Sequence, residues 1–163
     1  MNPTRSKLYQ WGNDLVGLFL PRRCAGCDNG LMRSEPCLSL ICMEALPRTR
    51  FHDDPLNSVE QLFRGKVELA AASSFLHFSS KGMVQRMLHR VKYQHDMQLG
   101  LFMGCLMAED LMTSTRFKDV DSFLPVPLHP RKEHMRGYNQ SQVLVDGMRQ
   151  RWPLPSIGKG LVR

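Results

Sequence analysis

Four closely spaced cysteines constrain this chain more than any other feature of its sequence. They follow the spacing C-x2-C-x9-C-x4-C, at Cys24, Cys27, Cys37 and Cys42. Two pairs of thiolates separated by a short loop can surround one tetrahedral Zn²⁺ ion, and nearby glycines suit the tight turns that such a site needs. We therefore predict a small zinc-ribbon-like module over residues 1–46, which begins with an amphipathic helix at residues 6–20. In so small a module, metal binding supplies folding free energy.

The second cysteine pair leaves alternatives open. Cys37 reaches the metal only if its turn is wide, which would give a zinc site with four cysteines. Otherwise the site is a three-cysteine or degraded metal site, or the cysteines are plain buried thiols that bind no metal. The five cysteines form an odd number, and no secretory signal precedes them, which argues against a disulfide framework. No run of apolar residues is long enough to cross a membrane. We expect a cytoplasmic protein with no membrane span.

The charge of the chain indicates an acidic partner. The chain has 163 residues, enough for one compact domain and a small satellite, and carries a formal net charge of +7 with a pI near 9.5. Such a basic balance favours phosphate, a nucleotide or a nucleic acid as ligand.

The residues after the cysteines predict a linker and then a main domain. Residues 47–65 are rich in polar residues, proline and glycine, which is typical of a linker. In the domain over residues 66–163, residues 67–78 alternate as a strand does, and Ser79 or Ser80 is expected to cap the helix that follows. A second helix is expected at about residues 97–112, with Cys105 as a core thiol.

The stretch from Ser122 to Gln142 has the order expected of an anion site. An apolar strand at residues 123–128 breaks at Pro125 and Pro127, and a basic turn follows it. Asn139 is then placed to cap a helix in a capping box with Gln142. A helix N-terminus beyond the carboxyl end of a strand is where open α/β sheets bind anions. The alternative is a solvated basic turn with no ligand.

The run PVPLHPRKEHMRGYNQS at residues 125–141 resembles the central motif of the ComF (competence protein F, GntX-like) family. The segment MLHRVKY at residues 87–93 and the terminal GLVR extend the resemblance over most of the chain. The resemblance implies a type I phosphoribosyltransferase-like α/β domain, Rossmann-like with a mostly parallel sheet, behind a zinc module. It also implies Mg²⁺ with phosphoribosyl pyrophosphate as ligand, and an association with competence and DNA uptake. The implied pyrophosphate-binding residues are Pro127, Leu128, His129, Arg131, Arg136, Asn139 and Gln140.

The chain departs from the family pattern in two places. ComF-like sequences carry C-x2-C at the second knuckle, whereas Ser39 stands at the first position of that pair here. The family's acidic pair before a Thr/Gly-rich turn, which binds the ribose and 5-phosphate, has no counterpart. We therefore expect a truncated domain with an incomplete sheet that promotes oligomerisation.

Three interpretations of function follow, and they leave the enzymatic question open. The first is a ComF-like, phosphoribosyltransferase-related protein in which Pro125–Gln140 forms the pyrophosphate-side loop. The second is a non-catalytic, zinc-dependent module that associates with single-stranded DNA or the competence machinery. The third is an inactive fragment without a ligand.

Overall fold

The computed structural model of the chain describes residues 22–158. It divides the chain into two compact units, Met1–Ala45 and Leu46–Arg163, which we describe separately. The predicted N-terminal helix at residues 6–20 and the terminal GLVR segment at residues 160–163 lie outside the described residues.

The first unit is built from a turn and one short helix. Backbone hydrogen bonds from Cys24 to Asn29 (2.8 Å) and from Asp28 to Cys24 (2.9 Å) close the turn. The helix α2 spans Leu40–Glu44, and the hydroxyl of its N-cap residue, Ser39, accepts a hydrogen bond from the Cys42 N–H. A Ser at the N-cap satisfies one of the N–H groups that a helix start leaves unpaired. The unit is therefore organised by hydrogen bonds around its cysteines.

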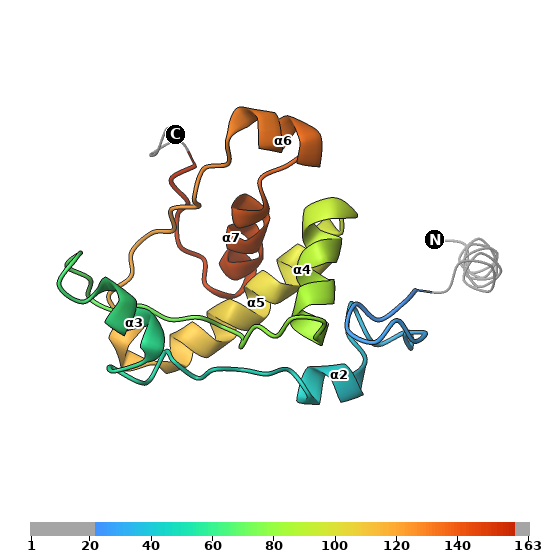
Figure 1. The fold of residues 1–163 in the computed structure, drawn as a ribbon, viewed down its shortest axis with the longest axis horizontal. Coiled ribbons are helices and arrows are strands. Elements are labelled where there is room, and N and C mark those ends of the chain that lie inside the picture. The colour runs from blue at the N-terminus through green and yellow to red at the C-terminus, as the bar shows by residue number, and fades with distance from the viewer. Residues whose placement is uncertain (1–21, 159–163) are drawn as a thin grey trace, which may run out of the picture. The chain divides into compact units, whose positions relative to one another are not determined.

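The second unit is helical, and its centre is the contact between α5 (Met97–Thr113) and α7 (Gln140–Arg151), beside α4 (Met83–Tyr93) (Figure 1). Two glycines allow this contact. A Cβ on Gly104 would come within 2.9 Å of the Cα of Gly147, and a Cβ on Gly147 within 2.9 Å of the Cα of Leu101. Real Cβ atoms do not approach backbone so closely. The helices therefore pack backbone to backbone where they meet.

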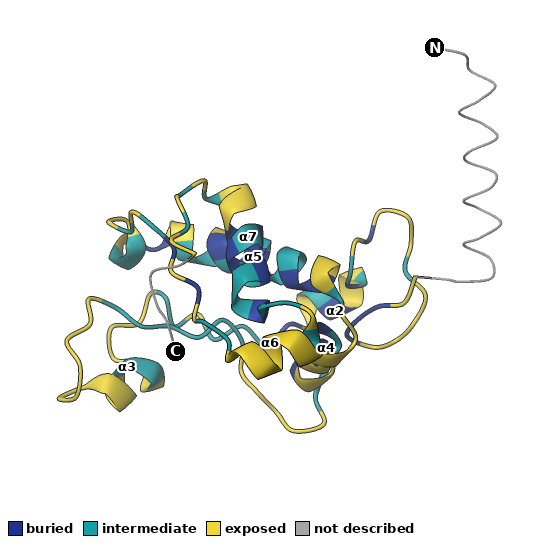
Figure 2. Cartoon of the chain, turned by 90° about the horizontal axis from the view of Figure 1, so that it is seen from above, coloured by how far each residue is buried: buried dark blue, intermediate teal, exposed yellow. Residues whose placement is uncertain are grey.

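The apolar core continues from α5 and α7 to the segments beside them. Phe123 packs edge-on against Trp152, with ring centroids 5.7 Å apart, and both contact the core around Ala108, Val145 and Met148. Figure 2 shows the buried residues concentrated on α5 and α7, whereas α6 (Pro130–Arg136) is exposed. The stability of this unit therefore resides in the helix pair and its immediate neighbours.

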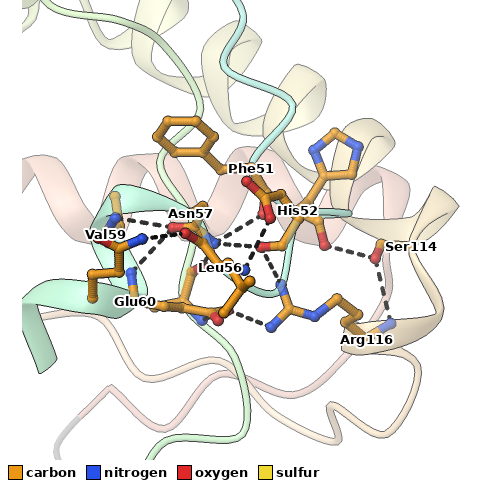
Figure 3. A network of polar contacts seen from close by, with 11 residues as sticks. Phe51, His52, Leu56, Asn57, Val59, Glu60, Ser114 and Arg116 are labelled. Carbon is orange, nitrogen blue, oxygen red and sulfur yellow. Dashed lines mark hydrogen bonds and ion pairs between the residues drawn. The ribbon is translucent and has the colours of Figure 1, made fainter. Parts of the chain in front are cut away.

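A polar network fixes the chain around α3 (Ser58–Phe63). The Asn57 side chain is 2% exposed, accepts from the N–H groups of residues 59 and 60, and donates to three backbone carbonyls of residues 51, 54 and 72 (Figure 3). Glu60 pairs with Arg116 of the short 3-10 helix η1 (Thr115–Phe117). The Ser114 hydroxyl donates to the carbonyl of His52 at 2.8 Å. The segment predicted as a linker is therefore tied to residues 114–116.

The predicted Rossmann-like, mostly parallel sheet is wrong. Residues 22–158 contain no strand longer than an isolated bridge: Arg23 pairs with Gly30, Arg48 with Leu76, and Phe123 with Ser156. The apolar residues that a covered sheet would bury remain exposed, namely Val67, Leu69, Leu124 and Val126. The helices pack on one another instead of on a sheet, and the prolines at 125 and 127 cannot donate ladder hydrogen bonds. Oligomerisation was predicted from the unpaired edge of this sheet, so the absence of a sheet among the described residues removes the reason for expecting it.

The helix predictions fare better than the strand predictions. The helix expected at about residues 97–112 is confirmed as α5, and Asn139 caps α7 as expected, because its Oδ1 accepts from the Ser141 N–H at 3.0 Å. The predicted caps of α4 are wrong, since its N-cap is Gly82. A helix, α6, also replaces the basic turn expected after residue 129.

Candidate functional site

Three of the four predicted metal ligands come together in the first unit. The Sγ atoms of Cys24, Cys27 and Cys42 all lie within 4.8 Å of one another. Cys24 and Cys42 are buried, and Cys27 is exposed. Cys37 is half-buried and does not belong to this group, although its carbonyl accepts a hydrogen bond from Ala25 at 2.9 Å. Among residues 22–158, the cluster therefore contains three thiols, which come from two separate segments of the chain.

Local backbone structure brings the three sulfur atoms close together. Cys24 and Cys27 belong to the same turn, and Cys42 lies in the first turn of α2. The N–H groups of Gly26 (3.4 Å) and Ser39 (3.2 Å) donate to the Cys24 sulfur. Such bonds stabilise a thiolate, because they place partial positive charge beside it. The site thus favours negative charge on sulfur.

The thiols differ in acidity. Burial raises the pKa of Cys24, but hydrogen bonds from Ser39, Cys27 and Gly26 outweigh it and lower the pKa to about 6. Burial raises the pKa of Cys42 to about 11. A bound cation favours the deprotonated form of each thiol ligand, so metal binding releases the proton that Cys42 otherwise holds. Metal affinity should therefore rise with pH.

The donor set identifies the class of metal that fits. Thiolates are soft ligands that select zinc, monovalent copper or iron–sulfur clusters, and not hard ions such as Mg²⁺. A tetrahedral zinc with Zn–S bonds of about 2.3 Å separates its sulfurs by about 3.8 Å, which lies within the span of the cluster. The residues present therefore fit a metal such as zinc.

The segment predicted to bind pyrophosphate lies partly on a cavity of the second unit. Five of its seven predicted residues line this cavity of about 490 Å³, together with Lys92; they are Pro127, Leu128, Arg136, Asn139 and Gln140. His129 and Arg131 do not line it. His129 instead caps α6, with its Nδ1 accepting from the Arg131 N–H at 3.2 Å. The structure therefore separates the predicted residues into two groups.

Among the residues predicted to bind pyrophosphate, Arg136 is the arginine that lines the cavity. Its guanidinium lies 5.6 Å from the ring centroid of Tyr93, and Nη1 donates to Oε1 of Gln140 at 2.8 Å. Its Nε is buried with no hydrogen-bond partner. A buried donor without a partner costs free energy.

Asn139 and Gln142 are already engaged in the protein. The Asn139 amide donates to the Val126 carbonyl at 3.0 Å while its oxygen caps α7. The capping box is wrong, because the Gln142 side chain bonds to Asp146 at 2.9 Å and does not return to residue 139. Most other residues that line the cavity are apolar, and they come from α4, α5 and α7 and from residues 75–78 and 126–128. Lys92 and Arg136 are thus its cationic groups.

Sequence reasoning gave Ser39 no role in the candidate metal site. Its hydroxyl lies 3.6 Å from the Cys24 sulfur and 4.0 Å from the Cys27 sulfur. The signal was present in the sequence, because a serine three residues before Cys42 is a typical N-cap, and an N-cap fixes where the side chains of the first helical turn point.

Comparison with models of protein families, with characterised proteins and with solved structures finds no match to this chain. The resemblance to the ComF family therefore stays a prediction. Among residues 22–158, no helix has both the length and the apolar character needed to cross a membrane.

Proposed function

We propose that residues 22–45 form a zinc-binding module whose metal is structural. The observation that carries this proposal is the convergence of the sulfurs of Cys24, Cys27 and Cys42 within 4.8 Å. Structural zinc sites have four ligands and no substrate position, and they contribute folding free energy directly. Backbone N–H groups that already point at the Cys24 sulfur support the same role.

Elemental analysis of the purified full chain tests the proposal. We expect close to one zinc per chain, and its loss in the Cys24→Ser variant. Cys105→Ser is the matched control, because the Cys105 thiol lies in the second unit and donates to the Gly147 carbonyl at 3.3 Å. Less than about a tenth of an equivalent in the unsubstituted protein, prepared without chelators, would contradict the proposal.

A second candidate function follows from the resemblance. We propose that the chain is ComF-like, related to phosphoribosyltransferases, and that its second unit binds the pyrophosphate end of phosphoribosyl pyrophosphate with Mg²⁺. The cavity beside Arg136 supports this, because Arg136 and Lys92 line it and supply two cations. Guanidinium groups suit phosphate oxygens. Binding is proposed here, and not transfer, since the chain lacks the acidic pair of the family.

Calorimetric titration with pyrophosphate and Mg²⁺ tests this candidate. We expect saturable binding that weakens at least tenfold in Arg136→Gln and in Lys92→Gln. Lys118→Gln removes the same charge from an exposed position outside the cavity and should leave the affinity unchanged. Equal losses in all three variants would show a general charge effect and exclude a site at Arg136.

The nucleic-acid hypothesis makes a different prediction. Binding of single-stranded DNA falls steeply with salt, because cations that neutralise phosphates release counterions. It also needs no Mg²⁺. Saturable pyrophosphate binding that requires Mg²⁺ supports the phosphoribosyl pyrophosphate hypothesis; salt-sensitive binding of oligonucleotides supports the DNA hypothesis. An absence of both contradicts the two binding hypotheses.

A further inference from the structure

The metal cluster of the first unit has a fourth polar group at its centre. Ser39 approaches all three thiol residues: its hydroxyl lies 3.6 Å from the Cys24 sulfur and 4.0 Å from the Cys27 sulfur. The same oxygen accepts from the Cys42 N–H at 3.4 Å. Cys37, the remaining predicted ligand, is not a member of the cluster.

These separations match a tetrahedron with one oxygen corner. With Zn–S bonds of about 2.3 Å and a Zn–O bond of about 2.0–2.2 Å, a tetrahedral ion places sulfur and oxygen about 3.5–3.6 Å apart. The Ser39 oxygen is within about half an ångström of that separation from both sulfurs of the turn. A small inward movement of the side chains therefore completes the coordination.

The backbone explains why Ser39, and not Cys37, has this position. Ser39 is the N-cap of α2, so its side chain points back over the helix start, toward the Cys42 N–H. The Cys37 carbonyl is held by Ala25 at 2.9 Å, and Ser39 N–H is held by the Cys24 sulfur at 3.2 Å. These two bonds hold the backbone of residues 37 and 39 beside the turn of Cys24, with the Ser39 side chain directed at the cluster.

We propose that the fourth ligand of the metal is the Ser39 hydroxyl oxygen, which gives a centre of three thiolates and one oxygen. This inference rests on the proposed zinc-binding function and specifies its coordination. A centre with one neutral oxygen carries one negative charge less than a four-thiolate centre. The exposed Cys27 thiol marks the side from which solvent reaches the site. The metal is therefore held less tightly than by four cysteines and exchanges with competing thiols.

Cobalt substitution counts the thiolates directly, because the intensity of the sulfur-to-cobalt charge-transfer band grows with each thiolate bound. In the full chain loaded with Co²⁺, Cys37→Ser should leave the band unchanged. Ser39→Cys should raise its intensity by about one third, the ratio of four thiolates to three, and should tighten metal binding at least tenfold. Cys105→Ser serves as the control outside the module.

Three outcomes would overturn the inference. They are a loss of about a quarter of the band in Cys37→Ser, no gain in Ser39→Cys, or X-ray absorption of the unsubstituted zinc protein that fits four sulfurs and no oxygen. The absorption measurement needs no variant, so it decides the question even if a substituted module fails to fold. A chain that binds neither zinc nor cobalt contradicts the zinc proposal itself, whereas a four-sulfur spectrum contradicts the Ser39 inference alone.

Discussion

The two units of this chain are stabilised by different means. In the described part of the first unit, the most buried side chains are those of Cys24 and Leu38, at 1% each, while the apolar residues Leu40 and Ile41 are 67% and 79% exposed. The second unit instead buries residues from three helices around a close contact between α5 and α7. The comparison indicates that the second unit is stabilised mainly by apolar burial, whereas little apolar surface is buried in the first, where we propose that a metal supplies the missing stability.

Metal removal should have the largest effect on stability of all the changes considered, and it should unfold the first unit while leaving the second folded. Structural zinc binding contributes about 10–16 kcal/mol in zinc-finger peptides, more than a module of this size gains from packing. Chelation, or Cys24→Ser, should therefore abolish amide-exchange protection of residues 22–45. Protection of α5 and α7 should remain. Loss of protection in both units together would show that they fold as one cooperative system.

Close helix packing can be broken separately in the second unit. A Cβ on Gly104 meets backbone atoms of Gly147 and Met148 at 2.9 Å, and backbone moves less readily than a side chain. Gly104→Ala should therefore destabilise this unit by about 3 kcal/mol, after the roughly 1 kcal/mol that alanine contributes to helix propensity. Urea unfolding measures the change, and the zinc content should stay constant.

Gly158→Ala is the matched control for this substitution. Its Cβ would have its nearest neighbour, the Gln142 side chain, at 3.8 Å, an ordinary contact. We expect a change within about 0.5 kcal/mol of zero. Equal destabilisation by both variants would show that the α5–α7 crossing has no special role.

Sequence patterns predicted the helices of this fold better than its strands. The spacing of Leu99, Phe102 and Leu106 repeats over several turns, and a long helix forms its hydrogen bonds within itself. A strand has no such internal support, because its hydrogen bonds go to a neighbour that the pattern does not identify. Residues 67–78 alternate as a strand should, yet their strand pairing is limited to one isolated bridge, between Leu76 and Arg48.

The candidate sites show the same limit. The knuckle of Cys24 and Cys27 could be predicted, since its thiols are linked by one local turn. Which residue completes the site depends on how the chain enters α2, and that depends on Ser39 as N-cap. In the second unit, Lys92 joins the cavity through packing of α4 against the others, which spacing alone does not determine.

The polar network of the second unit should contribute less than its helix packing. Asn57→Ala leaves two N–H groups and three carbonyls without their amide partner in a buried place. We expect a loss of about 2–3 kcal/mol in urea unfolding. Asn139→Ala removes a more exposed cap from α7 and should cost about 1 kcal/mol. The reverse order would contradict a role for the network in fixing residues 51–72.

The smallest effect concerns a feature that both units share: a carboxylate that accepts backbone N–H groups. Glu35 accepts from Met32 and Leu40 in the first unit, at 2.7 and 2.8 Å. In the second unit, the Ala72 N–H and then the Arg116 guanidinium lower the pKa of Glu60 below its ordinary value of 4.5. A lowered pKa in the folded state stabilises the protein above pH 4.5, and this contribution is lost as pH falls through the folded pKa.

Glu60→Gln should therefore reduce stability at neutral pH, and its difference from the unsubstituted protein should shrink as pH falls from about 6 to about 3. Urea unfolding followed by the fluorescence of Trp152, in a Trp11→Phe background, reports on the second unit, because Trp152 packs on Phe123 in its core. Metal ligands also gain protons in acid, so a probe confined to this unit is needed. A difference that stays constant over this range would show that the ionised Glu60 carboxylate adds nothing that the neutral amide cannot supply.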